Sequence, residues 1–451
     1  MRSSVAKVAF VGALMVFSFL YGFGAREWGW FPNSLIEQAW RQAKVVAPFA
    51  PPNFVNSRVY DRQGARQIAP EEIQPGLTLV TSMWEGPDGW KPEARLMDRS
   101  GRIVHKSRLD PQSLFPDSLD QRRVGRRYIH GSHLRPDGNL LVNFGQVGTV
   151  QVDACGRPQW RLAARSHHSI ERAEDGTYWI PGSSKTPRRT TPAHPDGFPG
   201  LDAPVYHEPI LHVSADGIVL DRLNVLDLLY ENDLERYIPE AYQPQAKDKG
   251  PQTKDITHMN DVEPLGASLA GEYPLFEAGD LLVSIRDLDL VLVFDPDTGT
   301  VKWHTEDPFI MHHDPDFIGD GWIGIFDNAR DFTFRGTMLG GSRIVAVQPH
   351  TDSVEIRFPT EHSDPFYTAS QGKWQQLRNG NMLLAESRTG RVVEVTPKGR
   401  TVWEWIHVPY DDDHVPAVTE ATRYDLTATE IASWPCSSMN TTSFTQPSRP
   451  E

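Results

Sequence analysis

Histidine residues occur at matching places ahead of several predicted strands. His168, His258 and His313 each precede an Asp-Gly or Gly-Asp turn that opens a strand, and His130 and His133 stand before a similar turn. Repeated strand units place equivalent positions around a common axis. We therefore expect His168, His258 and His313 to face one shared pocket, with His130 and His133 as further candidates.

These residue types together favour the binding of a tetrahedral dianion. Arg286 follows the strand of the His258 unit, and its guanidinium offers fork-like donors to a sulfate or phosphate. A neutral histidine can act as nucleophile, acid or base near neutral pH, so a group transfer could proceed in two steps through a covalent intermediate. The alternative is a zinc or manganese site, in which Asp314, Asp316 or Glu263 join the histidines.

Each residue also has a purely structural interpretation. A histidine ahead of a turn commonly caps the turn or fills the core, and Asn260 could cap a turn in the same way. Arg286 could simply form an ion pair with Asp287 or Asp289. The repeated placement of the histidines in neighbouring units, rather than any single residue, favours a site.

The elements that must position these residues are short strands. The chain is rich in glycine (35) and proline (36), and 10% of its residues are aromatic, a composition typical of strands separated by turns. Strand units with such turns recur at 95–104, 136–162, 174–219, 279–303, 319–347 and 378–405. A single unit cannot bury both faces of its sheet, so the units must stack and close into a ring. We predict an all-β, six-bladed propeller.

The N-terminus carries an apolar run from Val8 to Gly24, with Arg2 and Lys7 before it. We predict an uncleaved transmembrane helix that keeps the N-terminus in the cytoplasm, and a cleaved signal peptide is the alternative. The predicted organisation is a membrane anchor (1–30), an amphipathic helix and linker (31–75), the propeller (76–430) and a C-terminal tail (431–451).

Charge and cysteine content exclude some functions. The formal net charge of −14 makes nucleic acid an unfavourable partner, and any anionic substrate needs a local positive pocket. The two cysteines, Cys155 and Cys436, lack zinc-site spacing and could pair if the tail lies near Cys155.

Three segments resemble the bacterial arylsulfate sulfotransferases, above all their membrane-anchored branch. They are His258-Met259-Asn260-Asp261, Val283-Ser284-Ile285-Arg286, and His313-Asp314-Pro315-Asp316 leading to Phe326-Asp327-Asn328. The resemblance implies a six-bladed propeller that moves sulfate between phenols without a nucleotide donor, a cofactor or a metal. The chain lacks the closely spaced cysteine pair of the soluble members and keeps an anchor, which leaves its acceptor open.

The resemblance also implies roles for individual residues. His313 becomes the sulfated nucleophile, and His258 and Arg286 bind the sulfuryl oxygens. The implied catalytic residues are His313, His258, Arg286 and His168, and the implied substrate-binding residues are Asn260 and His167, the latter a rival of His168.

The predicted function is therefore sulfuryl transfer from an aryl sulfate to a phenolic or other hydroxyl acceptor through a sulfohistidine. The predicted location is the bacterial inner membrane, with the propeller in the periplasm. An envelope protein partner or a second copy of the chain is a further expectation. The alternatives are a non-catalytic envelope propeller, serving as scaffold or anion binder, and a metal-dependent hydrolase.

Overall fold

The computed structural model describes residues 2–28, 54–87, 89–116, 128–201, 203–239 and 255–436. The chain divides into two compact units, Met1–Asn53 and Phe54–Glu451. The first unit contains helix α1 (Arg2–Trp28), which includes the apolar run of the sequence. None of the helices in the described ranges combines the length and the apolar character needed to span a membrane.

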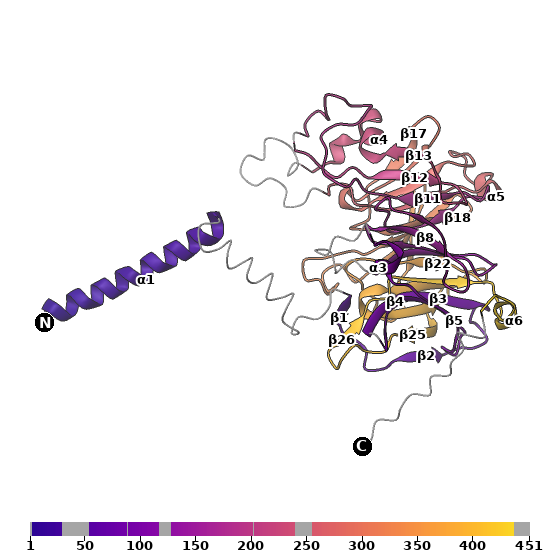
Figure 1. The fold of residues 1–451 in the computed structure, drawn as a ribbon, viewed down its shortest axis with the longest axis horizontal. Coiled ribbons are helices and arrows are strands. Elements are labelled where there is room, and N and C mark those ends of the chain that lie inside the picture. The colour runs from indigo at the N-terminus through magenta and orange to yellow at the C-terminus, as the bar shows by residue number, and fades with distance from the viewer. Residues whose placement is uncertain are drawn as a thin grey trace, which may run out of the picture. The chain divides into compact units, whose positions relative to one another are not determined.

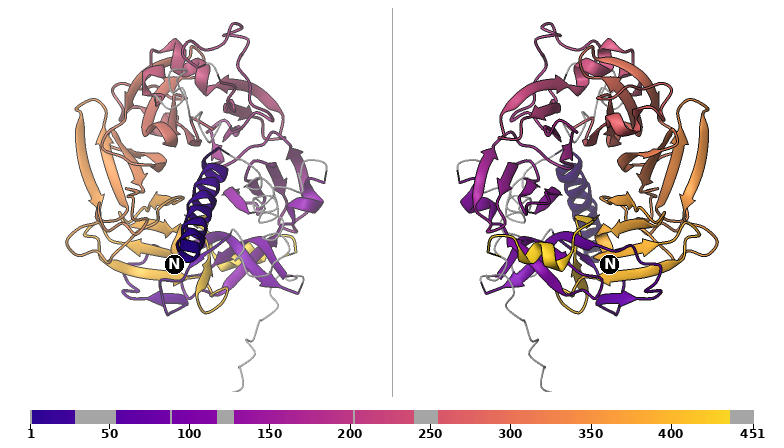
Figure 2. Two further views of the ribbon diagram at one scale, coloured as in Figure 1. Left: turned by 90° about the vertical axis from the view of Figure 1, so that its left-hand side faces the viewer. Right: turned by 90° about the vertical axis from the view of Figure 1, so that its right-hand side faces the viewer.

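The second unit is a ring of six antiparallel blades (Figures 1 and 2). From the axis outward, the first blade consists of β27 (Glu420–Tyr424), β3 (Leu77–Gly86), β4 (Gly89–Met97) and β5 (Ile103–Arg108), and the second of β6 (Ile129–Leu134), β7 (Leu140–Phe144), β8 (Gly148–Val152) and β9 (Pro158–Leu162). The third blade consists of β10 (Glu171–Arg172), β11 (Tyr178–Pro181), β12 (Pro209–Val213) and β13 (Val219–Asn224), and the fourth of β14 (Met259–Pro264), β15 (Leu281–Ile285), β16 (Leu290–Asp295) and β17 (Thr300–Thr305). The fifth blade consists of β18 (His313–Gly319), β19 (Trp322–Asp327), β20 (Arg343–Gln348) and β21 (Ser353–Phe358), and the last of β22 (Trp374–Gln376), β23 (Met382–Glu386), β24 (Arg391–Val395) and β25 (Thr401–Ile406). The predicted six-bladed propeller is confirmed.

In the described part of the second unit, the helices are short and lie between the strands. They are α3 (Pro111–Leu114), α4 (Val225–Glu231), α5 (Ala267–Ala270) and α6 (Ala428–Ala432), with 3-10 turns at Glu235–Tyr237, Arg286–Leu288 and Ser387–Thr389. The second of these turns follows β15 directly and carries one of the predicted site residues.

The middle strands of each blade are buried on both faces between neighbouring blades. For this reason β15 and β16 read as nearly continuous apolar runs rather than as alternating ones, and every residue of β15 is buried. The outer strand β21 lies at the rim, and its first four residues are exposed. The first strands of neighbouring blades meet near the axis, for example β14 with β18 and β22 with β27.

The ring closes by pairing the two ends of the propeller chain. Strand β27 pairs with β3 from Glu420 opposite Thr81 to Tyr424 opposite Leu77. Strand β2 (Gly64–Gln67) adds a fifth strand to the edge of the last blade, and β1 (Val55–Ser57) pairs with β26 (His414–Pro416). One blade thus contains strands from both ends of the propeller chain, which closes the ring.

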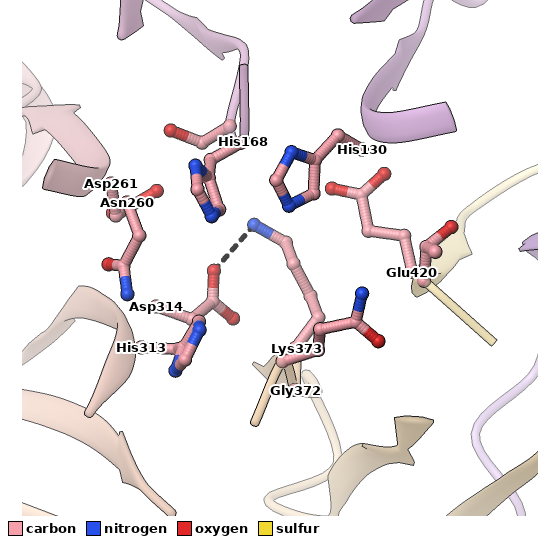
Figure 3. A pocket seen from close by; sticks show the side chains of 12 residues that line it. His130, His168, Asn260, Asp261, His313, Asp314, Gly372, Lys373 and Glu420 are labelled. Carbon is pink, nitrogen blue, oxygen red and sulfur yellow. Dashed lines mark hydrogen bonds and ion pairs between the residues drawn. The ribbon is translucent and has the colours of Figure 1, made fainter. Parts of the chain in front are cut away.

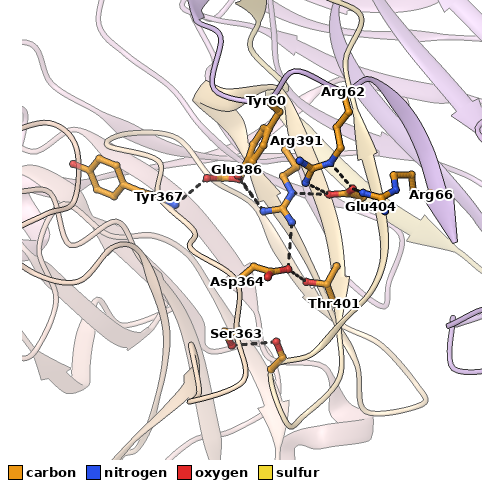
Figure 4. A network of polar contacts seen from close by, with 11 residues as sticks. Tyr60, Arg62, Arg66, Ser363, Asp364, Tyr367, Glu386, Arg391, Thr401 and Glu404 are labelled. Atoms are coloured by element: carbon orange, nitrogen blue, oxygen red, sulfur yellow. Dashed lines mark hydrogen bonds and ion pairs between the residues drawn. The ribbon is translucent and has the colours of Figure 1, made fainter. Parts of the chain in front are cut away.

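The segment before β3 is held against the last blade by buried charges (Figure 4). Arg391 is 3% exposed and lies 3.2 Å from Glu404 and 3.5 Å from Glu386. The Tyr60 hydroxyl donates to Glu386 at 2.8 Å, and Arg62 donates twice to Glu404, at 2.8 and 2.9 Å. A buried charge without its partner is costly, so these contacts fix the segment on the blade.

The predicted boundaries differ from the observed unit at both ends. Strands β1 and β2 belong to the ring, although they lie within the range 31–75 assigned to the linker. Cys155 and Cys436 form a disulfide, with their Cα atoms 5.4 Å apart, so the start of the predicted tail is tied to the second blade. The predicted amphipathic helix around 34–40 and the tail beyond 436 lie outside the described residues.

Candidate functional site

The predicted histidines and arginine come together in one pocket of about 240 Å³. His168 precedes β10, His258 precedes β14, His313 opens β18, and Arg286 opens the turn after β15. Besides these four, the lining includes Tyr128, His130, Gly145, Gln146, His167, Glu208, Ser370 and Gln371. Loops of neighbouring blades thus place distant parts of the sequence around one cavity.

The loops ahead of the inner strands share an unusual backbone conformation. His168, His258 and Gln371 have φ angles of +53°, +46° and +61°, in the left-handed region that non-glycine residues seldom adopt. Such a conformation costs about 1–3 kcal/mol and persists where the surroundings enforce it. It recurs ahead of β10, β14 and β22, so it belongs to the way these blades present side chains to the pocket.

His168 lies at the centre of the histidine group. Its ring centroid lies 5.2 Å from that of His258 and 6.4 Å from that of His313. His130 is closer still, with its ring centroid 3.7 Å from that of His168. His130 therefore belongs to the site, whereas His133 does not line this pocket and contacts Tyr178 instead.

The hydrogen bonds of His313 fix its tautomer. Its Nδ1 lies 2.6 Å from Asn328 Oδ1 and 3.1 Å from the carbonyl of Met311. Asn328 donates through Nδ2 to two carbonyls, so its Oδ1 must be the acceptor. Nδ1 of His313 therefore carries the proton, and Nε2 keeps a lone pair that no described residue engages.

His258 is oriented in a similar way. Its Nδ1 lies 2.7 Å from Asp255 Oδ2, which directs Nε2 away from the carboxylate. Asn260 is buried and donates through Nδ2 to the carbonyl of His312 at 2.8 Å, so it holds the backbone just ahead of His313. Asn260 lines a smaller cavity next to the histidine pocket.

Arg286 both forms an ion pair and lines the pocket, which are the two roles considered for it from the sequence. It donates through Nε and Nη2 to Asp287 Oδ1, at 2.9 and 2.7 Å, as the structural interpretation predicts. It also lines the pocket, and its Nη1 makes no hydrogen bond with a described residue. The guanidinium is thus held in place while part of its donor set stays available to an anion.

His167 and His168 form a contacting pair. Their Nδ1 atoms lie 2.8 Å apart, so one ring donates to the other. His167 is 2% exposed, and its Nε2 lies 3.4 Å from Glu208 Oε1. His167 therefore packs against the His168 ring and is the more deeply buried of the two.

Two imidazoles of the pocket, those of His168 and His313, are held neutral. Burial lowers the pKa of His168 well below its ordinary value, and the neighbouring His130 and His167 act in the same direction. Burial followed by the charge of Arg286 lowers the pKa of His313, although its bond to Asn328 opposes the shift. A neutral His313 with a free Nε2 is a competent nucleophile near neutral pH.

A cluster of carboxyl groups surrounds Lys373 on the inner strands (Figure 3). Lys373 Nζ contacts Asp314 at 2.7 Å and Glu171 at 3.4 Å. Burial opposes the ammonium charge, but Asp314 and Glu171 outweigh it and raise the pKa of Lys373. We call this set the axial carboxyl cluster; its acids are Glu171, Asp261, Glu263, Asp314, Asp316 and Glu420.

One ammonium cannot neutralise six carboxylates in a buried space. Burial raises the pKa of Asp261, Glu263 and Asp316 well above the ordinary range, and it raises that of Glu420 to about 7. Several of these acids are consequently protonated at neutral pH. Within the described part of the chain, no three His, Cys, Asp or Glu side chains are grouped so as to hold a metal ion.

Sequence analysis named Glu263, Asp314 and Asp316 only as possible metal ligands and did not predict this cluster around Lys373, although a signal for it exists. The residue three places after His168 is Glu171, and the residue three places after His258 is Asp261. Asp316 stands at the same distance from His313. The chain thus places a histidine ahead of the inner strand and an acid on it, repeatedly. Lys373 has no such signal, because Gln371 replaces the histidine in the last blade.

Fold and site together define a propeller whose axial pocket combines several imidazoles with the guanidinium of Arg286, as suits a tetrahedral anion. The sequence model of the arylsulfotransferase (ASST) family matches residues 148–408, more than half of the chain. The chain belongs to the arylsulfotransferase family. Membership supports sulfuryl transfer as the general chemistry of the site.

Solved structures similar to the chain have low sequence identity. A protein of unknown function from Bacteroides caccae is 13% identical, with a TM-score of 0.45, over 74% of this chain and 94% of that one. TolB from Acinetobacter baumannii is 13% identical, with a TM-score of 0.40, over 77% and 66%. Virginiamycin B lyase from Staphylococcus aureus is 11% identical, with a TM-score of 0.34, over 67% and 86%. No curated protein matches the chain.

Proposed function

We propose that the chain transfers a sulfuryl group from an aryl sulfate to a phenolic or other hydroxyl acceptor, and that His313 carries the group between the two. The observation that carries the proposal is the state of His313. Asn328 holds its Nδ1–H, its ring is neutral, and its Nε2 is free in the pocket that Arg286 and His258 also line.

In the first step, His313 Nε2 attacks sulfur as the bond between sulfur and the aryl oxygen breaks. The phenolate leaves with the electron pair of that bond and takes up one proton. Arg286 and His258 bind the sulfuryl oxygens, whose charge is stabilised by donors already fixed in the pocket. The product of this step is a sulfohistidine and a free phenol.

In the second step, the acceptor hydroxyl attacks the same sulfur. The bond between sulfur and Nε2 of His313 breaks, and the acceptor loses its proton. We assign this proton to His168, because its ring is neutral and its centroid lies 6.4 Å from that of His313. His168 then gives this proton up to solvent, which supplies the one that the leaving phenolate takes up, so the cycle is balanced and His168 is neutral again.

The test is acceptor-dependent release of nitrophenol from 4-nitrophenyl sulfate by the full chain. His313→Asn should lower the rate by about a thousandfold or more, since a nucleophile is lost. The exposed His362 provides the matched control, and His362→Asn should keep the wild-type rate. Equal rates for wild type and His313→Asn contradict the proposal, and an intact aryl sulfate with wild type favours a non-catalytic propeller.

We also propose that α1 tethers the propeller to the inner membrane, with the propeller in the periplasm. Two observations support this location. The large apolar side chains from Phe10 to Phe23 are exposed on α1, and disulfides such as Cys155–Cys436 form in oxidising compartments. Extraction of membranes with alkaline carbonate is the test. The full chain should stay in the pellet, and release into the supernatant contradicts a membrane-spanning tether.

A further inference from the structure

A second and larger cleft lies between the second and third blades, beside the histidine pocket. Its volume is about 770 Å³, within the range of sites that bind molecules of several rings. Its lining comes mainly from the segment after β9, the long connection between β11 and β12, strand β13 and the start of α4. Nothing in the proposed sulfuryl transfer uses this cleft.

The cleft is positively charged, in contrast to the chain as a whole. Arg165, Lys185, Arg188 and Arg222 line it, while the net charge of the protein is −14. Lys185, Arg188 and Arg222 are exposed, and none of the described carboxylates lies within ion-pair distance of them. Unpaired cations gathered in a cleft focus the field there and attract anions.

Among the described lining residues one acid, Asp227, offsets only one of these four positive charges. Asp227 accepts a hydrogen bond from the Thr191 hydroxyl at 2.6 Å and lies 2.8 Å from His194 Nδ1. The remaining polar lining consists largely of hydroxyl groups, including those of Ser183 and Ser184. No Phe, Tyr or Trp is among the described lining residues, so the cleft offers no aromatic platform for a flat phenol.

The cleft and the histidine pocket are separated by a thin wall. Gln146 lines the histidine pocket and the next residue, Val147, lines the cleft. Likewise, Glu208 lines the histidine pocket, and the preceding residue, His207, lines the cleft. Arg165, on the cleft side, donates to Gln146 Oε1 at 3.1 Å. The cleft therefore adjoins the pocket that holds His313, with a single layer of residues between them.

We infer that this cleft binds the acceptor, and that the acceptor is an acidic oligosaccharide whose carboxylates or sulfate esters meet Lys185, Arg188 and Arg222. The inference rests on the proposed sulfuryl transfer and names its acceptor class. Sugar hydroxyls fit a lining of hydroxyls and guanidinium groups, and repeated negative charges match several separated cations better than one small anion does.

Binding is tested apart from catalysis. Fluorescent hexagalacturonate is titrated into the full chain carrying His313→Asn, with its methyl ester as the uncharged probe. The acidic hexamer should bind, the ester should bind at least about tenfold more weakly, and added salt should weaken the binding of the hexamer alone. Equal binding of hexamer and ester, or equal binding of hexamer and galacturonate monomer, overturns the inference.

A triple variant locates the binding. Lys185→Ser, Arg188→Ser and Arg222→Ser together should raise the Kd for the acidic hexamer about tenfold, because exposed ion pairs contribute modestly but add up. The control removes the same charge elsewhere on the surface, at Arg99, Arg335 and Lys398, which are exposed. An unchanged Kd in the cleft variant, or an equal loss in the control, overturns the inference.

Transfer assays separate this inference from the proposed function. In an otherwise wild-type chain, the triple variant should raise the KM for hexagalacturonate as acceptor about tenfold and leave transfer to phenol unchanged. Transfer to phenol without any binding of the hexamer overturns the acceptor inference alone. If the hexamer binds at the cleft but no acceptor receives a sulfuryl group, the cleft is an oligosaccharide-binding site and the proposed sulfotransferase function is refuted.

Discussion

Replacing Glu420 by glutamine should change how the stability of the propeller depends on pH. Glu420 is 4% exposed, accepts a hydrogen bond from the Ser132 hydroxyl and faces the other acids around Lys373. Burial raises the pKa of its carboxyl from 4.5 to about 7. At about 1.4 kcal/mol for each pH unit, the ionised form is disfavoured by about 3 kcal/mol in the folded state.

The sign follows from proton binding. Between pH 4.5 and about pH 7, the folded protein keeps the Glu420 proton that the unfolded chain has released. The contribution of Glu420 to stability is therefore present in acid and is lost as the pH rises through this window. From about pH 5 to about pH 8 the loss is about 2.5 kcal/mol. Glu420→Gln removes this pH-dependent loss of stability, because a glutamine keeps an acceptor for the Ser132 hydroxyl and does not titrate.

Urea denaturation of wild type and Glu420→Gln at the two pH values measures this difference. The variant should lose about 2–3 kcal/mol less stability than wild type on going to the higher pH. All other acids titrate in both proteins, so the comparison isolates one residue. Glu361→Gln, on an exposed side chain, controls for the charge removed. An identical pH dependence in wild type and Glu420→Gln would refute a buried, protonated Glu420.

Four further predictions concern the histidine pocket and the disulfide. Asn328→Leu removes the acceptor that fixes the His313 tautomer and should lower the turnover number for sulfuryl transfer about 10- to 100-fold in steady-state assays, with unfolding followed in parallel. Because burial lowers the pKa of His168 and His313, a pH–rate profile should show transfer persisting as the pH falls below 6.5, whereas a loss with a midpoint at 6.5 contradicts neutral buried rings. The same shifts should make the fold less stable as the pH falls below 6.5, because the unfolded histidines take up protons first. Reduction of Cys155–Cys436, which spans 281 residues, should lower stability by about 2–5 kcal/mol in thermal melts, and a melt insensitive to reductant contradicts this.

Much of the ring could be predicted because its signals are local. A run such as that of β16 is apolar at nearly every position, since both faces are covered, and each unit contains its own turn residues. The histidine pocket could be predicted for a related reason. The loop ahead of each inner strand occupies the same place in each blade, so equivalent positions at 168, 258 and 313 had to converge.

What sequence reasoning missed depends on contacts between distant segments. Strands β1 and β2 are three and four residues long and mostly polar, and only pairing with the end of the chain makes them strands. Asn328 belongs to a motif noticed in the sequence, but its bond to His313 exists only because β18 and β19 pair. Lys373 has no histidine ahead of it in its blade, and its role follows solely from the acids that the other blades bring to the axis.

The most direct measurement of the central claim is mass spectrometry of the full chain after brief exposure to an aryl sulfate without acceptor. The peptide that carries His312 and His313 should gain the mass of one sulfuryl group, and the fragment ions should place the group on His313. Adding a phenol should remove the group and yield its aryl sulfate. Nitrophenol release without any labelled peptide, or a label on another residue that the phenol does not discharge, contradicts the account.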